Sequence, residues 1–293
     1  MPCGRVVFSL DESMQRVRKI ALSFLKIILL AGAGTVLILA SCQSRLIYFP
    51  RPYGAGTVSE WQKMTRGKFI DVQTSQGRQR AFLQGNLKNP RHLWIVCGGN
   101  GTVALDWSDW FSEYAPREDA YLLVDIPGYG DSAGKPTPGR IRENFQKAIP
   151  AAMKEFGWMP EKDSTRLRFF GHSLGSAGCL MAADDFHIQR GVLIAPFSST
   201  MDMAKKITHL PIGFLVWHRM DNDKKLTNIG KHGPGKVIIF HGVEDEVIPV
   251  DMSRELAAHH LSLVKLIEIP GGRHNTIPAS HASQLAEAMR EVE

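Results

Sequence analysis

The sequence predicts an α/β protein built on a mostly parallel central sheet with helices on both faces. Two observations lead to this prediction. Short, continuous apolar runs alternate with amphipathic segments along most of the chain, as strands buried on both faces alternate with helices. The chain has 293 residues, 44% of them hydrophobic, which is enough for one large domain with a buried core.

The chain begins with a segment typical of a targeting signal, so residues 1–41 are predicted to be a signal peptide or membrane anchor. A basic cluster at 16–19 precedes an apolar stretch at 27–39, which at about 13 residues is short for a spanning helix. The string Leu-Ala-Ser-Cys at 39–42 resembles the lipobox of bacterial lipoproteins, in which the cysteine is acylated and becomes the first residue after cleavage.

This resemblance implies that Cys42 is lipidated and that residues 42–293 form a domain tethered to a membrane. An acylated thiol anchors a chain to a bilayer. The implied location is the bacterial cell envelope, facing the periplasm or the exterior. The alternative is an uncleaved anchor helix over residues 20–40, which Lys26 would interrupt.

Each later element is predicted from its own local pattern. A hairpin is expected around residues 75–77 because turn residues there separate two alternating segments. Buried strands and amphipathic helices follow from continuous apolar runs and from helical spacing of apolar residues. The strands are expected at 92–99, 120–128, 166–170, 191–196, 236–242 and 263–270, and the helices at 106–115, 141–156, 175–186, 252–261 and 279–291.

Charge and cysteine content exclude several classes of function. The net charge is +6, but part of the excess lies in the leader and no basic stripe with interleaved aromatics follows, so no nucleic-acid partner is expected. Cys3, Cys42, Cys97 and Cys179 have no paired spacing, so neither a metal site nor a disulfide framework is predicted. The glycine-rich loop at 128–134 lacks the flanking residues of a phosphate loop.

A candidate nucleophile lies between a predicted strand and a predicted helix. The stretch from Gly171 to Gly175 reads G-H-S-L-G, with Ser173 at its centre. A sharp strand-to-helix turn exposes a serine hydroxyl, and the helix N-terminus favours a nearby oxyanion. His172 is predicted to be structural.

A serine becomes a nucleophile when a base takes its proton, most often a histidine held by a carboxylate. Asp245 follows the strand predicted at 236–242, and His274 follows the strand predicted at 263–270. Parallel strands present the loops after them at one edge of a sheet, so these residues are expected to meet Ser173. Glu246 is the alternative acid.

These motifs resemble those of the α/β-hydrolases, in particular serine hydrolases with short lids, over residues 46–291. The matches are H-G-x-x-D-x-x-I-P at 241–249, G-x-H-N at 272–275, and D-I-P-G-Y-G-D-S-A-G-K-P-T at 125–137. The segment R-L-I-Y-F-P-R-P-Y-G at 45–54 resembles the one that follows the membrane anchor in BEM46-like and palmitoyl-thioesterase-like members.

The resemblance also implies an oxyanion hole in the loop after the first buried strand. The usual H-G-N-G-x is present with Gly98 in place of the histidine. Backbone N–H groups of Asn100 and Leu174 are the expected donors, with Gly99 as the alternative to Asn100. A short lid is expected over about residues 200–235, either as a plain helical cap or as an apolar slot for an acyl chain.

The predicted function is a membrane-tethered serine hydrolase that cleaves an ester or thioester through an acyl-enzyme. Ser173, His274 and Asp245 are its expected catalytic residues, and no cofactor is required. The expected substrate is a small-molecule or lipid-like acyl ester. The alternatives are a serine peptidase of the same fold and a catalytically silent, hydrolase-like scaffold.

Overall fold

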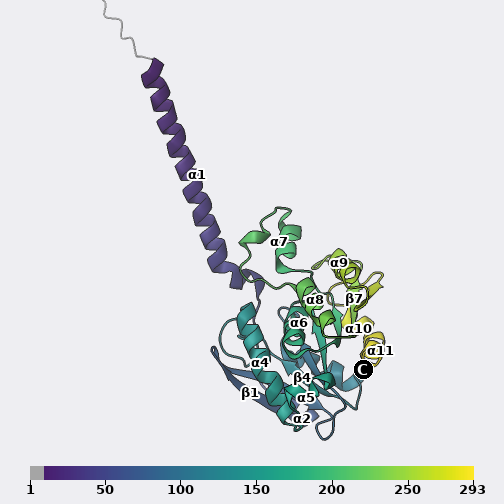
Figure 1. Cartoon of the computed structure of the whole chain (residues 1–293). Coiled ribbons are helices and arrows are strands. Elements are labelled where there is room, and N and C mark those ends of the chain that lie inside the picture. The colour runs from purple at the N-terminus through teal and green to yellow at the C-terminus, as the bar shows by residue number, and fades with distance from the viewer. Residues whose placement is uncertain (1–9) are drawn as a thin grey trace, which may run out of the picture. The chain divides into compact units, whose positions relative to one another are not determined.

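Eight strands form one sheet in the order β1-β2-β4-β3-β5-β6-β7-β8. The structure is a computed structural model and describes residues 10–293 (Figure 1). β2 runs antiparallel to both of its neighbours, β1 and β4, and every other neighbouring pair is parallel. The predicted α/β fold with a mostly parallel sheet is confirmed.

The strands lie close to the predicted positions because continuous apolar runs are buried on both faces of a parallel sheet. All five residues of β3 and of β4 are buried. The predicted hairpin joins the first two strands. The strands are β1 (Lys68–Thr74), β2 (Gly77–Gly85), β3 (Leu93–Cys97), β4 (Ala120–Val124), β5 (Leu167–His172), β6 (Arg190–Ile194), β7 (Lys236–Gly242) and β8 (Val264–Ile269).

The helices include all five that the sequence predicts, with shifted ends. One begins earlier than expected, at Pro138, because the Thr137 hydroxyl accepts a hydrogen bond from the Arg140 N–H and caps it. The α-helices are α1 (Leu10–Ile47), α2 (Thr57–Thr65), α3 (Ser108–Tyr114), α4 (Pro138–Lys154), α5 (Pro160–Asp163), α6 (Leu174–Phe186), α7 (Thr200–Thr208), α8 (Asn222–Lys231), α9 (Asp251–His259), α10 (Ile277–Ser280) and α11 (Ala282–Glu291); the 3₁₀ helices are η1 (Ala104–Trp107), η2 (Ser164–Arg166) and η3 (Gly213–Leu215).

Successive side chains along the strands belong to two separate buried hydrophobic clusters, one on each face of the sheet. On β3, Ile95 belongs to one cluster and Trp94 to the other. The first cluster includes residues of α4, α6, α8 and α9, and the second includes residues of α2, α3, α10 and α11. Figure 1 shows α4, α6 and α8 side by side. Helices therefore cover both faces and leave the strand ends as the accessible edge.

Two compact units divide the chain, Met1–Gln43 and Ser44–Glu293. Within the first, the stretch Met14–Leu37 has a mean hydropathy of 2.2 and is long and apolar enough to cross a membrane. Signal sequences share these properties, so α1 agrees with either a signal or an anchor. Residues 1–9 of the predicted leader, with Cys3, lie outside the described residues.

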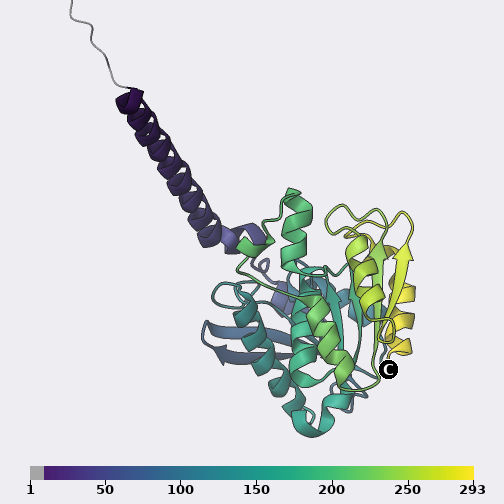
Figure 2. The same ribbon diagram turned by 45° about the horizontal axis from the view of Figure 1, so that its top comes forward.

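The predicted lid region contains two parts with different surroundings. An isolated bridge between Ser199 and Asp221 closes its base, and a hydrogen bond from the Thr200 N–H to the Met220 carbonyl (2.9 Å) reinforces that closure. The part of the predicted lid that lies outside the helical layer is therefore the loop from Thr200 to Met220, which carries α7 above the sheet edge (Figure 2). The second part, α8, belongs to the helical layer, where Leu226 is fully buried.

A buried carboxyl group joins three loops near the accessible edge of the sheet. Asp125, directly after β4, is 1% exposed. Its carboxylate accepts hydrogen bonds from the Ala104 N–H and the Tyr53 hydroxyl, both at 2.7 Å. Burial raises the pKa of Asp125 to about 7, against the opposing effect of these two hydrogen bonds. The carboxyl group of Asp125, in the loop after β4, thus binds both the segment before α2 and the loop after β3.

We predict that Asp125→Asn removes a pH-dependent part of the stability. An unfolded aspartate titrates near about 3.9, so the folded protein binds the proton more tightly. The contribution of this group to the free energy of unfolding is then complete below about pH 4 and is lost as the pH rises through 7, by at most about 1.4 kcal/mol per pH unit. Urea unfolding between pH 4.5 and 8 should show that the wild-type advantage over the asparagine variant shrinks. A difference independent of pH would contradict the prediction.

Candidate active site

Ser173 occupies the one-residue turn between β5 and α6. Its φ of 53° and ψ of −120° are a strained conformation for a residue with a side chain. A Cβ at Gly171 would approach the Cα of Ser176 to 2.7 Å, and a Cβ at Gly175 would overlap the backbone of Cys97. Both glycines therefore permit the close approach of α6 to the sheet that makes this turn so sharp.

The structure brings Ser173, His274 and Asp245 together at the carboxyl edge of the sheet. The Nε2 atom of His274 lies 3.0 Å from the Ser173 Oγ. The Nδ1 atom of the same ring lies 2.7 Å from the Asp245 Oδ2. The ring thus contacts a hydroxyl through one nitrogen and a carboxylate through the other, and all three residues follow the ends of strands.

The surroundings of Asp245 keep it ionised. Its Oδ1 accepts hydrogen bonds from the Val247 and Ile248 N–H groups, both at 2.8 Å. Its Oδ2 faces His274 and also the Nε2 of His241, at 3.3 Å. Burial alone would raise the pKa of Asp245, but the hydrogen bonds outweigh it and leave the pKa well below its usual range. The imidazole of His274 therefore lies beside a permanent negative charge.

The alternative acid, Glu246, has a different position. Its side chain accepts a hydrogen bond from the backbone N–H of His274 at 3.3 Å and pairs with Arg273 at 3.4 Å. Neither contact involves the imidazole. Of the two candidate acids, Asp245 is the one that contacts the ring.

His172 lies beneath the site and packs against it. Its ring centroid is 5.2 Å from that of His274, and its Nε2 is 3.2 Å from the His274 carbonyl oxygen. Burial lowers the pKa of His172 to about 4, so it is neutral at pH 7. A Cβ at Gly99 would meet the His172 Nδ1 at 2.9 Å. His172 therefore supports both His274 and the loop after β3.

The two residues expected to hold an oxyanion both lie beside Ser173. Asn100 and Leu174 line one cavity together with this serine. Leu174 is the first residue of α6, where a backbone N–H has no partner within the helix. Gly98 stands where the H-G-N-G-x motif has a histidine, and the difference has a steric reason. A Cβ at position 98 would lie 2.7 Å from the Trp107 Nε1. Trp107 occupies the space that a side chain at position 98 would need.

The side chain of Asn100 is bound to other parts of the chain. Its Nδ2 donates to the Ile47 carbonyl oxygen at 2.6 Å. Its Oδ1 accepts from the Phe49 N–H at 2.9 Å and from the Tyr129 hydroxyl at 2.6 Å. The carboxamide of Asn100 therefore binds backbone groups of Ile47 and Phe49. Of Asn100, the backbone N–H is the group left to donate a hydrogen bond to an oxyanion.

An apolar cavity of about 310 Å³ lies beside Ser173. Within residues 10–293, the polar residues that line it besides Ser173 are Asn100 and Thr200. The apolar lining comes from the predicted lid, from the loops after β6 and β7, from the start of α6, and from the end of α1 with the residues that follow it: Leu46, Ile47, Phe49, Leu174, Phe197, Met203, Ala204, Ile207, Val216, Val247 and Ile248. Such a surface suits a hydrocarbon chain.

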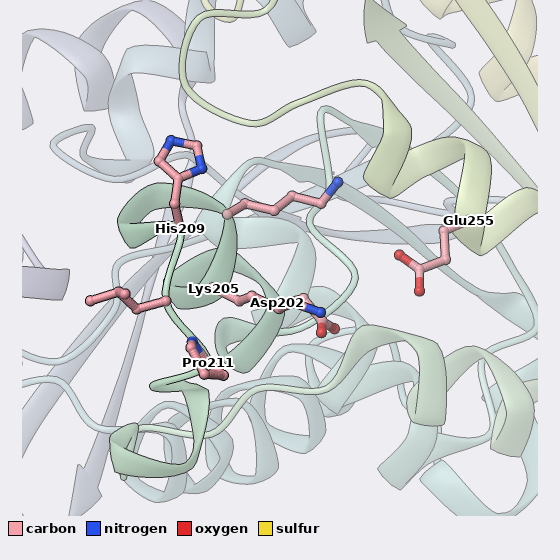
Figure 3. Close-up of a pocket in the computed structure, with 7 residues that line it drawn as sticks. Asp202, Lys205, His209, Pro211 and Glu255 are labelled. Carbon is pink, nitrogen blue, oxygen red and sulfur yellow. The ribbon is translucent and has the colours of Figure 1, made fainter.

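A larger cavity of about 510 Å³ lies between α7 and α9 and does not include Ser173. Figure 3 shows Glu255 reaching toward it from a different helix than Asp202 and Lys205. Its lining also includes Lys206 and His209, so both signs of charge are present. Because no candidate catalytic residue lines it, the smaller apolar cavity is the candidate substrate site.

Among the described residues, one group of metal-binding side chains converges: His92, Asp119 and Glu293. It lies at the start of β3 and β4, at the opposite edge from Ser173. The Asp119 carboxylate accepts from the His92 N–H at 2.9 Å and from the Trp94 Nε1–H at 2.7 Å. Both of its oxygens are engaged by the protein, so the group has a structural role.

Sequence reasoning missed three contributors to the cavity, Leu46, Ile47 and Phe49. The available signal was the segment R-L-I-Y-F-P-R-P-Y-G at 45–54, which marked a resemblance without indicating a position. The structure places its first residues against the loop after β3.

No family model matches the sequence, but curated relatives do. An uncharacterised protein of Mycobacterium tuberculosis is 26% identical over 95% of this chain and 96% of its own length. Human alpha/beta hydrolase domain-containing protein 17B is 24% identical over 75% of this chain and 74% of its own. Uncharacterised protein YfhR of Salmonella typhi is 29% identical over 66% of this chain and 68% of its own.

Solved structures share the fold. An esterase of Pyrococcus furiosus superposes with a TM-score of 0.62 and 18% identity, covering 84% of this chain and 97% of its own. An alpha-beta hydrolase of Vibrio vulnificus has a TM-score of 0.62 and 15% identity, covering 81% and 88%. The strand order and these likenesses show that the chain has the α/β-hydrolase fold, in agreement with its likeness to human alpha/beta hydrolase domain-containing protein 17B.

Proposed function

We propose that the protein is a serine hydrolase that cleaves an ester or thioester through an acyl-enzyme. The observation that carries the proposal is the continuous chain of contacts from the Ser173 Oγ through His274 to the Asp245 carboxylate, at 3.0 Å and 2.7 Å. Both distances are within hydrogen-bond range for a nucleophile and its base. The strained backbone at Ser173 adds support, because such strain is concentrated at functional sites.

In the first half-reaction, the Ser173 Oγ attacks the acyl carbonyl carbon while its proton passes to the His274 Nε2. Asp245 stabilises the resulting imidazolium and keeps Nδ1 protonated. The oxyanion accepts hydrogen bonds from the backbone N–H groups of Leu174 and Asn100, each worth roughly 3 kcal/mol of barrier in comparable sites. Collapse breaks the bond to the leaving alcohol or thiol, which takes the proton from Nε2.

In the second half-reaction, water replaces the leaving group. His274 takes a proton from the water as its oxygen attacks the acyl-enzyme carbonyl. The second tetrahedral intermediate then collapses, and Ser173 leaves with the proton from Nε2. The products are a carboxylic acid and the free enzyme, and the steps balance without any cofactor.

The cavity beside Ser173 supports an acyl chain as the group that is bound. One water molecule occupies about 30 Å³ in the liquid. The cavity, with a volume of about 310 Å³, therefore has room for about ten groups of that size. The solved structures with a similar fold include an esterase of Pyrococcus furiosus, which agrees with this substrate class. A medium-length acyl ester or thioester is therefore the proposed substrate.

The two alternatives have less support. A peptidase that recognises a free amino terminus needs a carboxylate in its substrate site, and none lines this cavity in the described part of the chain. A catalytically silent scaffold does not explain the strained backbone of Ser173. It also does not explain why the His274 imidazole lies between the Ser173 hydroxyl and the ionised Asp245.

We also propose that the chain is attached to a membrane, with lipidation at Cys42 and a location in the bacterial envelope facing the periplasm or exterior. The apolar stretch Met14–Leu37 and the lipobox-like string before Cys42 support this proposal. An acyl-binding cavity in the adjoining domain is compatible with substrates that partition into lipid.

Labelling with a fluorophosphonate probe tests the nucleophile. We expect the wild-type protein to label, Ser173→Ala not to label, and the variant to lose at least about a thousandfold in ester hydrolysis. Ser176→Ala, in the adjoining helix α6, is the matched control, since its buried hydroxyl has no hydrogen-bond partner among the described residues and its loss should be nearly neutral. Equal labelling of the Ser173→Ala variant would refute the assignment.

Paired variants distinguish the two candidate acids. Asp245→Asn should lower kcat by about 10³–10⁴-fold, because an amide neither stabilises the imidazolium nor holds the required tautomer. Glu246→Gln should stay within a few-fold of the wild type, because that side chain contacts backbone N–H groups and Arg273 rather than the imidazole of His274. Initial rates on a nitrophenyl ester provide the measurement. The reverse ranking would make Glu246 the acid.

Metabolic labelling with palmitate in a bacterial host tests the anchor. The wild type should incorporate label and have Cys42 as its mature N-terminus, whereas Cys42→Ser should do neither. Cys97→Ala is the control and should still be labelled, because Cys97 is buried in the core. A mature wild-type protein that keeps residues 1–41 and remains in the membrane would instead support the uncleaved anchor helix.

A further inference from the structure

The end of α1 and the residues that follow it are bound to the loop that carries Asn100. The Asn100 carboxamide holds the Ile47 carbonyl oxygen at 2.6 Å and the Phe49 N–H at 2.9 Å. The Tyr129 hydroxyl also accepts from the Phe49 N–H at 2.9 Å. Two backbone groups at the end of α1 therefore have their hydrogen bonds satisfied by the active-site loop.

Further contacts extend this attachment on both sides. The Arg51 Nε–H donates to the Gly101 carbonyl oxygen at 2.9 Å, and its guanidinium pairs with Asp106. Tyr48 is 2% exposed, and its hydroxyl lies 3.3 Å from the Nδ1 of His218 in the lid. Residues 46–51, here called the linker segment, are thus fastened to the loop after β3 and to the lid.

The linker segment lines the acyl cavity. Leu46, Ile47 and Phe49 contribute to it together with Ser173. Leu46 and Phe49 remain 60% and 59% exposed, whereas Ile47 is only partly exposed. The buried Tyr48 lies between Ile47 and Phe49 in the sequence, and the Asn100 carboxamide binds the backbone of both. The large apolar side chains of the linker segment are thus held at the rim, where they offer a surface to a hydrocarbon chain.

We propose that the linker segment is a specificity-determining part of the active site, in which Leu46, Ile47 and Phe49 form one wall of the acyl site and determine which chain lengths are accepted. This inference rests on the proposed serine hydrolase function and deepens it. The wall comes from a part of the chain outside the sheet and outside the lid, so chain-length selectivity should respond to changes there while the chemistry at Ser173 does not.

The test compares nitrophenyl acetate, octanoate and palmitate as substrates of the full chain in detergent. Ile47→Trp places a larger side chain in the cavity, and we expect the octanoate-to-acetate ratio of kcat/KM to fall at least tenfold. Each buried methylene of the substrate is worth about fourfold, so the loss of two or more methylene contacts produces this change. Labelling by a short-chain fluorophosphonate probe serves to show that the folded variant keeps a reactive Ser173.

Leu261→Trp is the matched control, because Leu261 is 84% exposed and does not line the acyl cavity; its chain-length profile should equal that of the wild type. If Ile47→Trp fails to fold, Phe49→Ala decides, with an expected fall of at least about threefold in the octanoate-to-acetate ratio. Wild-type selectivity in the folded variant would overturn the inference while the hydrolase function stands. A wild-type chain that neither labels nor hydrolyses esters would overturn both.

Discussion

The close approach of α6 to the sheet at Ser173 is the constraint on which the rest of the site depends. Gly175 lies against the backbone of Cys97 at the end of β3, so any side chain there would push the helix away. The approach forces Ser173 to a φ of 53°. The local strain is of the order of 1–3 kcal/mol and persists because the fully buried strands and helix around it leave no other path for the chain.

A sheet of parallel strands then supplies the partners. β7 and β8 end at the same edge as β5, so the loops that follow them present Asp245 and His274 to the serine. The acid keeps its charge despite its burial because two backbone N–H groups and two imidazoles contact it. Hydrogen bonds to a carboxylate stabilise the charged form, which offsets desolvation.

The substrate side of the site has a different origin. Its apolar surface is assembled from the lid, from two loops after strands, and from the linker segment, residues 46–51. None of these parts is a regular element of the sheet. Their positions depend on polar anchors, such as the Asn100 carboxamide and the buried carboxyl of Asp125. The contacts among Ser173, His274 and Asp245 therefore lie on the rigid frame of the sheet, whereas the apolar wall of the cavity lies on segments attached to that frame.

Much of the fold follows from local pattern. Continuous apolar runs predict buried strands, and their alternation with amphipathic segments predicts a parallel sheet. The positions of Ser173, Asp245 and His274 follow as well, since each comes directly after a predicted strand and parallel strands end at one edge. The first residue of a helix is harder to predict than its apolar face. Thr137 caps α4 and lets the helix begin at Pro138, before the first apolar residue of the periodic pattern.

The sequence by itself determined the sheet and the three residues at its edge, because strand patterns and the residues after them are local properties. For the acid, the sequence favoured Asp245 and left Glu246 as the alternative. Only the tertiary structure shows that the Asp245 carboxylate contacts the imidazole whereas the Glu246 carboxylate contacts the His274 backbone, since adjacent side chains point in different directions. It also decided the wall of the cavity. Phe49 and Asn100 are 51 positions apart, and a hydrogen bond across that distance depends on packing between elements, which no local pattern encodes.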